Sequence, residues 1–216
     1  MLGSGTWKIT PWQDFEKVGL QELFDIGFDL AALLELQGPS ASSVSAEEIQ
    51  QQQRLLISCS DIDGRLTQWC ILHCPNENNR SHLHGEQTAE LSQLSLFHRR
   101  QRRTFNSLSE AINAVYYWLL RLVLNELIVA ALLPAVISDD ASGISKERLA
   151  QSSLMLALDI LATGSYFLED DKGWFGPQRY VFPLRRAMMH LSNVGSPLQQ
   201  EGEATLSRLI ARFRPR

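Results

Sequence analysis

Two long stretches of this sequence are predicted to be the strongest helices: residues 107–131 are apolar on almost every face that a helix would present, and residues 145–168 carry a single charged residue after Arg148. A helix of that kind has to be surrounded by protein or by lipid. The longest uncharged run in the region, residues 127–138, is too short to span a bilayer as a helix. We therefore expect two core helices, and no membrane as a partner.

Start and stop signals predict further helices around these two. Thr10-Pro11-Trp12-Gln13 is typical of a helix start, and Gly38-Pro39 of a helix stop. The residues Asp61-Ile62-Asp63-Gly64 predict a turn after a second helix that begins near residue 46, and a short helix or strand should follow. The other expected elements are helices at 86–102, 183–192 and 201–213 and a loop at 170–177.

Neither a run of alternating strands nor an internal repeat is visible in the 216 residues. A chain of this length can bury an apolar core without disulfides. We therefore predict one all-α domain over residues 1–216. It should be a bundle of about seven to nine helices in which residues 75–93 form a flexible loop.

Composition limits the partners. The 24 Asp and Glu residues outnumber the 20 Lys and Arg residues, and the net charge is −4, so direct DNA binding is not expected. Three cysteines and no apolar signal-peptide core after Met1 are typical of reduced thiols inside a cell. We expect a cytoplasmic or nuclear protein without a cofactor. The oligomeric state is left open, and a homodimer is one alternative.

Residues 104–192 carry two patterns of apolar and turn positions. The first is Phe105-Asn106-Ser107-Leu108-Ser109-Glu110-Ala111 with Tyr116-Tyr117-Trp118-Leu119-Leu120. The second joins Ala157, Ile160 and Tyr166 to Gly173, Gly176-Pro177 and Phe182-Pro183-Leu184-Arg185-Arg186-Ala187. Over about two-fifths of the chain they resemble the C-terminal regulatory domain of fungal binuclear zinc-cluster transcription factors. The resemblance implies an all-α fold, a fungal origin and an apolar ligand.

The cysteine count departs from that family. Its DNA-binding part needs six closely spaced cysteines, and this chain has three in total. A free-standing chain of this kind either acts through partners or reuses the helical fold in fungal specialised metabolism. The fold alone does not decide between these two uses.

Two charged residues stand out within the apolar helices, Arg121 in the first and Asp159 in the second. An unpaired buried charge is very costly, so we expect the two to face each other. The pair is either a structural ion pair that fixes helix register or the catalytic pair of an aromatic small-molecule site. The substrate-binding residues of such a site would be Tyr117, Trp118, Asn125 and Tyr166.

Such a site could work without a cofactor. Aromatic walls could hold the two reacting ends of a substrate in near-attack geometry, and Arg121 could donate a hydrogen bond to a substrate carbonyl. The ordinary interpretation of the same aromatic residues is a packed core.

Three further signals have ordinary explanations. Cys70, His73, Cys74, His82 and His84 carry zinc-binding atoms, but their spacing is not that of a standard zinc site, so no metal is expected. The basic run at residues 99–103 is either an import or phosphate-binding signal or a solvated charged segment, and we expect the latter. A lone histidine such as His190 is more typical of a satisfied structural residue than of a catalyst.

Two functions therefore remain open. The first is a cofactor-free enzyme that cyclises or isomerises an apolar terpenoid- or polyketide-like small molecule, as a pericyclase does. The second is a non-enzymatic ligand-sensing or partner-binding regulatory domain without a DNA-binding module of its own. The sequence slightly favours the enzyme.

Overall fold

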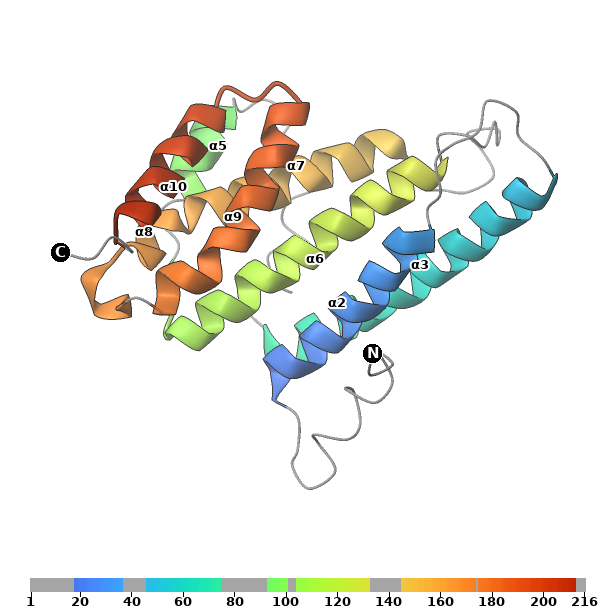
Figure 1. Ribbon diagram of the computed structural model, residues 1–216, viewed down its shortest axis with the longest axis horizontal. Coiled ribbons are helices and arrows are strands. Elements are labelled where there is room, and N and C mark those ends of the chain that lie inside the picture. Colours follow the sequence, from blue (N-terminus) through green and yellow to red (C-terminus); the bar gives the residue numbers. More distant parts are fainter. Residues whose placement is uncertain are drawn as a thin grey trace.

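The computed structural model describes residues 18–36, 46–74, 93–100, 104–132, 145–173 and 175–212, and every regular element among them is helical (Figure 1). The all-α prediction is therefore confirmed for these residues. The elements are α2 (Gly19–Leu36), α3 (Ala46–His73), α5 (Gln93–Arg100), α6 (Leu108–Leu132), α7 (Lys146–Ala162), α8 (Gly164–Phe167), α9 (Phe175–Asn193), α10 (Gln199–Arg212) and a 3-10 turn at Asp170–Lys172.

Six of these helices are long: α2, α3, α6, α7, α9 and α10. The predicted number of seven to nine is slightly higher than this. Helix α5 has eight residues and α8 is a single turn. The predicted helix start at Thr10–Gln13, the stop at Gly38-Pro39 and the loop at 75–92 lie outside the described residues, while Gln93 begins α5.

Helix α6 runs through the middle of the molecule, with α2 and α3 on one side and α7, α9 and α10 on the other (Figure 1). Its first part packs into an apolar cluster with α7, α9 and α10, where Trp118 and Leu122 are buried. Its last part, with Leu124 and Leu127, packs into a second cluster with α2 and α3. This double role explains why the α6 sequence is apolar nearly all round.

Helix α6 is also long and apolar enough to cross a membrane by length and composition. In the structure, 56% of its most apolar stretch is buried against other parts of the protein. A core helix meets the same criterion of length and composition. The sequence predicts a core helix here, and α6 packs against other helices on both sides.

The predicted turn at residues 61–64 is wrong, because α3 continues through it to His73. Ile62 and Leu66 on either side of Gly64 are buried. Arg65 lies 2.9 Å from Asp29 of α2 and 3.8 Å from Asp61 one turn earlier. Tertiary packing and these ion pairs outweigh the local preference of aspartate and glycine for turns.

The predicted loop at residues 170–177 is shorter than expected, since α9 begins at Phe175. Gly176 and Pro177 belong to its first turn, where a proline costs no hydrogen bond. The helix also continues through the buried Pro183. It is held to α7 by the buried Tyr180, whose hydroxyl donates to the Ile160 carbonyl oxygen at 2.6 Å.

Candidate functional site

The two charged residues of the apolar helices do not pair with each other, which corrects the expectation that Arg121 faces Asp159. Arg121 of α6 forms an ion pair with Asp63 of α3. Asp159 of α7 forms one with Arg100 of α5. The Arg121–Asp63 pair therefore joins α6 to α3, and the Arg100–Asp159 pair joins α5 to α7. The two ion pairs lie on different sides of α6.

The Arg100–Asp159 pair is buried, with 7% and 8% of the two side chains exposed. The second guanidinium nitrogen of Arg100 lies 3.9 Å from the sulfur of Met155. The expectation that the basic run at 99–103 is solvated is thus wrong for Arg100. The pair ties α5 to α7, as expected of a structural ion pair in an apolar setting.

The Arg121–Asp63 pair is more open, with 26% and 47% of the side chains exposed. Arg121 also lies 6.0 Å from the ring centre of Tyr117. The Tyr117 ring stacks on Trp69 of α3, with ring centres 6.0 Å apart. Burial raises the pKa of Tyr117 well above its ordinary value, although the Arg121 charge opposes the shift, so its hydroxyl stays protonated at neutral pH.

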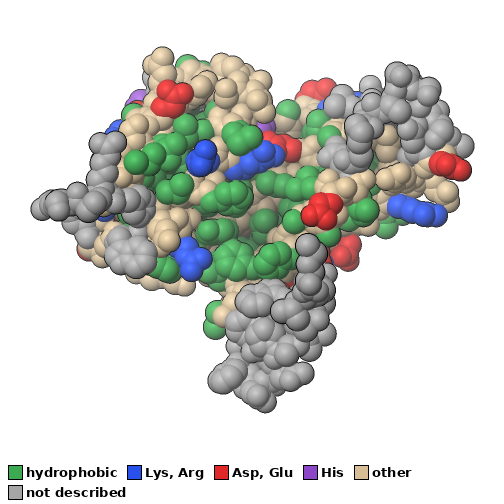
Figure 2. All heavy atoms as spheres, in the orientation of Figure 1, with side chains coloured by type: hydrophobic (Ala, Val, Ile, Leu, Met, Phe, Trp, Pro, Cys, Tyr) green, Lys and Arg blue, Asp and Glu red, His purple; other side chains and the backbone are tan. Residues whose placement is uncertain are grey.

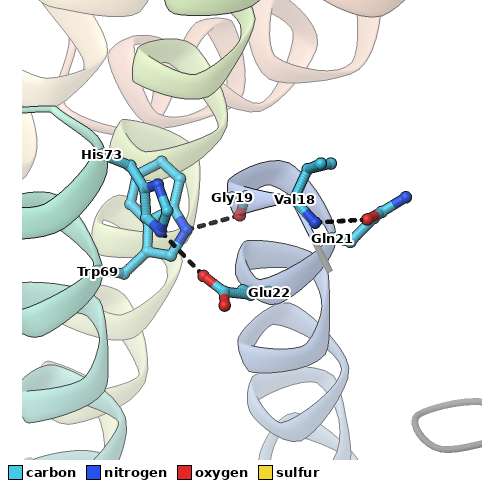
Figure 3. Close-up of polar contacts among 6 residues, drawn as sticks. All are labelled: Val18, Gly19, Gln21, Glu22, Trp69 and His73. Atoms are coloured by element: carbon cyan, nitrogen blue, oxygen red, sulfur yellow. Dashed lines mark hydrogen bonds and ion pairs between the residues drawn. The ribbon is translucent and has the colours of Figure 1, made fainter. Parts of the chain in front are cut away.

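Trp69 and His73 connect this cluster to the start of α2 (Figure 3). The indole N–H of Trp69 donates to the Gly19 carbonyl oxygen at 2.6 Å, and His73 Nε2 lies 2.9 Å from Glu22 Oε2. A Cβ on Gly19 would lie 2.7 Å from His73 Nδ1, so this close approach requires glycine. These contacts join α2 and α3.

The cysteines of the same region are buried thiols. Cys70 and Cys74 are both buried, and neither forms a disulfide among the described residues. Burial raises the pKa of Cys59 to about 11. His82 and His84, which the zinc alternative needs, lie outside the described residues. Within the described ranges, no group of three or more His, Cys, Asp or Glu residues is arranged to hold a metal ion.

The remaining predicted substrate-binding residues are buried in helix contacts. Trp118 is 2% exposed and belongs to the first apolar cluster. Tyr166 is 8% exposed and packs edge-on against Phe105. Asn125 donates from its amide to the Ser152 hydroxyl at 3.3 Å, which links α6 to α7. The structure thus distributes the six predicted site residues over several helix contacts.

Helix α9 carries a stripe of exposed apolar residues. Phe175, Phe182 and Met189 follow one another at intervals of seven residues. They are 42%, 64% and 55% exposed. We call these three residues the α9 stripe. Figure 2 shows hydrophobic side chains gathered over the region of α9 and α6, with Lys and Arg side chains among them.

The side of α9 that faces α6 is polar and well bonded. Arg179 hydrogen-bonds the hydroxyl of Tyr116, whose pKa is raised by burial and lowered in part by this arginine. Arg186 forms an ion pair with Glu126, and His190 Nδ1 lies 2.8 Å from the same carboxylate. His190 is thus engaged at this nitrogen, whereas its Nε2 is buried and has no hydrogen-bond partner in the part of the chain that the structure describes, so the expected satisfied histidine is found at one ring nitrogen only. These bonds fix the rotation of α9 about its axis and hence the direction of the α9 stripe.

Sequence reasoning missed Asp63, Arg100 and the α9 stripe. The local sequence predicts a turn at Asp63 and a solvated run at Arg100. The seven-residue spacing of Phe175, Phe182 and Met189 was readable from the sequence. It became informative only once α9 was known to begin at Phe175, because the predicted helix began at residue 183.

No protein-family model, curated protein or solved structure matches the chain significantly.

Proposed function

We propose that this chain is a non-enzymatic partner-binding domain of the regulatory kind that residues 104–192 resemble, working in the cytoplasm or nucleus. The observation that carries the proposal is the α9 stripe, in which three large apolar side chains are 42–64% exposed on one helix. Exposed apolar side chains that gather on one face and are bordered by polar residues are typical of protein interaction sites, and Figure 2 shows such a gathering over the region of α9 and α6. The rigid bonding of α9 to α6 presents this surface in one orientation.

The placement of the predicted catalytic residues also supports a binding role. Asp159 is engaged by Arg100, and Arg121 by Asp63. Both pairs join helices that are far apart in sequence. Charged groups engaged in this way serve the assembly of the bundle.

Site-specific photo-crosslinking tests the proposal. A photoreactive phenylalanine analogue replaces Phe182 in one variant and Ile57 of α3 in the control, since Ile57 is even more exposed at 71%. In extract of the native cells, we expect a discrete crosslinked partner with the Phe182 variant, and loss of this product when Met189→Asp is added. Equal products from both positions, or a product that ignores Met189→Asp, would contradict the proposal.

A cofactor-free cyclase or isomerase of fungal specialised metabolism is the second candidate. The observation in its favour is the partly exposed Arg121 beside Tyr117. These two residues supply a cation and a protonated hydroxyl next to an aromatic stack. Both donors could polarise a carbonyl of an apolar terpenoid- or polyketide-like substrate.

Mass spectrometry of a native metabolite extract, before and after incubation with the purified protein, tests this second function. An ion that disappears while a new peak of identical mass appears would support it, provided that Arg121→Ala abolishes the change. An ion retained and released unchanged would instead indicate a ligand-sensing domain. An unchanged spectrum with no retained ion counts against both.

A further inference from the structure

We propose that the α9 stripe binds an acidic amphipathic helix of a partner protein. This inference rests on the proposed function and adds the chemistry of the partner. It is carried by two properties of α9, the spacing of its exposed apolar residues and the sign of its charges.

The spacing fits a helix. Phe175, Phe182 and Met189 recur every seven residues, so they form one narrow seam along α9. One apolar residue in every seven supplies one of the two seam positions through which a helix packs along another. From Phe175 to Met189 the seam is about 21 Å long at 1.5 Å per residue, which matches four turns of a partner helix. The seam is exposed along this whole length.

The charges of α9 select the sign of the partner. Helix α9 contains Arg179, Arg185 and Arg186 and neither aspartate nor glutamate, in a chain whose net charge is −4. Arg179 and Arg186 lie on the α6 side of the seam, where they contact Tyr116 and Glu126. At 100° per residue, Arg185 lies on the side of the seam opposite to Arg179 and Arg186. Its side chain is exposed. The charge of Arg186 is already matched by Glu126, so Arg179 on one side of the seam and Arg185 on the other are the basic residues that carboxylates of a partner would complement.

Two other occupants are disfavoured. In a symmetric dimer through α9, the arginines of one copy would face those of the other. A membrane is disfavoured because the single seam is narrower than the broad apolar face of a helix that lies in lipid.

Two designed peptides of roughly 18 residues test the inference. Both carry leucine at seam positions, and one is flanked by glutamate and the other by lysine. Binding to the full chain is measured by fluorescence anisotropy. We expect the glutamate peptide to bind at least roughly tenfold more tightly than the lysine peptide, and added salt to reduce this preference.

Three variants locate the contact. Phe182→Asp should weaken binding of the glutamate peptide at least roughly tenfold, and Phe182→Ala should weaken it less. Arg185→Glu should reduce or reverse the preference between the peptides. Ile57→Asp on α3 is the matched control and should change nothing. Because Phe182 and Ile57 are both highly exposed, these variants should unfold at the temperature of the unmodified chain.

Each other outcome overturns the inference. Equal binding of the two peptides, tighter binding of the lysine peptide, or no binding removes the acidic helix as the occupant. Binding to phosphatidylserine vesicles that depends on Phe182, without peptide binding, points to a membrane. Self-association that Phe182→Asp abolishes points to a second copy. The proposed function has a separate test. It is contradicted when the crosslinked product formed in cell extract does not depend on the residues of the α9 stripe.

Discussion

Neutralising one charge of the buried Arg100–Asp159 pair tests how the C-terminal cluster is held together. The change Asp159→Asn keeps the shape of the side chain but removes its charge. Arg100, only 7% of whose side chain is exposed, then carries a buried charge without an opposite charge on Asp159. Removing one partner of a buried ion pair typically costs about 3–5 kcal/mol of unfolding free energy.

That free energy corresponds to a large shift in unfolding temperature. In a chain of this size, each kcal/mol lowers the Tm by about 2–4 °C, so we expect a fall of about 6–20 °C. Differential scanning calorimetry at pH 7 measures it directly. Asp63→Asn is the matched control, because it breaks a pair that is 26% and 47% exposed and worth at most about 1 kcal/mol.

A double replacement completes the test. Arg100→Met combined with Asp159→Leu removes both charges and keeps the volume, so it should recover most of the lost stability. The reasoning would be refuted if Asp159→Asn lowered the Tm no more than Asp63→Asn. It would equally be refuted if the double variant were less stable than Asp159→Asn alone.

Three further predictions concern glycines and a thiol. Gly64→Ala should stabilise the chain by about 0.5–1 kcal/mol in urea unfolding, because Gly64 lies inside α3 and a Cβ there meets nothing within 4 Å; a loss of stability would contradict the continuous helix. Gly164→Ala should cost about 1–3 kcal/mol, since its Cβ would lie 2.7 Å from the Thr205 methyl, and Thr205→Ser should recover part of this loss. Burial raises the pKa of Cys59 to about 11 from 9.0, so iodoacetamide at pH 8 should modify it on the order of 100-fold more slowly than in the urea-unfolded chain. Because the folded chain then holds this proton more tightly, Cys59 should reduce stability as pH rises from about 9 to 11; a Cys59→Ala variant should lack this contribution.

The fold class could be predicted because the strongest signals were local and redundant. Residues 107–131 are apolar nearly all round. Helix α6 begins and ends within one residue of these expected bounds, and it packs into two apolar clusters. The expected start of the next helix at Ser145 is also borne out, since its hydroxyl accepts the Arg148 N–H and caps α7. These features depend on a few neighbouring residues, which a single sequence contains.

The partners of the charged residues could not be predicted in the same way. That Arg121 and Asp159 need partners follows from their apolar surroundings. Which residues supply these partners depends on how helices remote in sequence pack. Asp63 and Arg100 lie 58 and 59 residues from their partners. Residues 61–64 also predict a turn, which places Asp63 outside a helix. The burial of Ile62 and Leu66 in α3 outweighs this local preference.

Amide chemical-shift mapping by NMR, during titration with the glutamate-flanked peptide, locates the surface through which the chain is proposed to contact a helix. We expect the shifted amides to cluster in α9 around Phe175, Phe182 and Met189 and to extend to the adjoining residues of α6. Shifts centred on α3 around Ile57, or no shifts at saturating peptide, would contradict it.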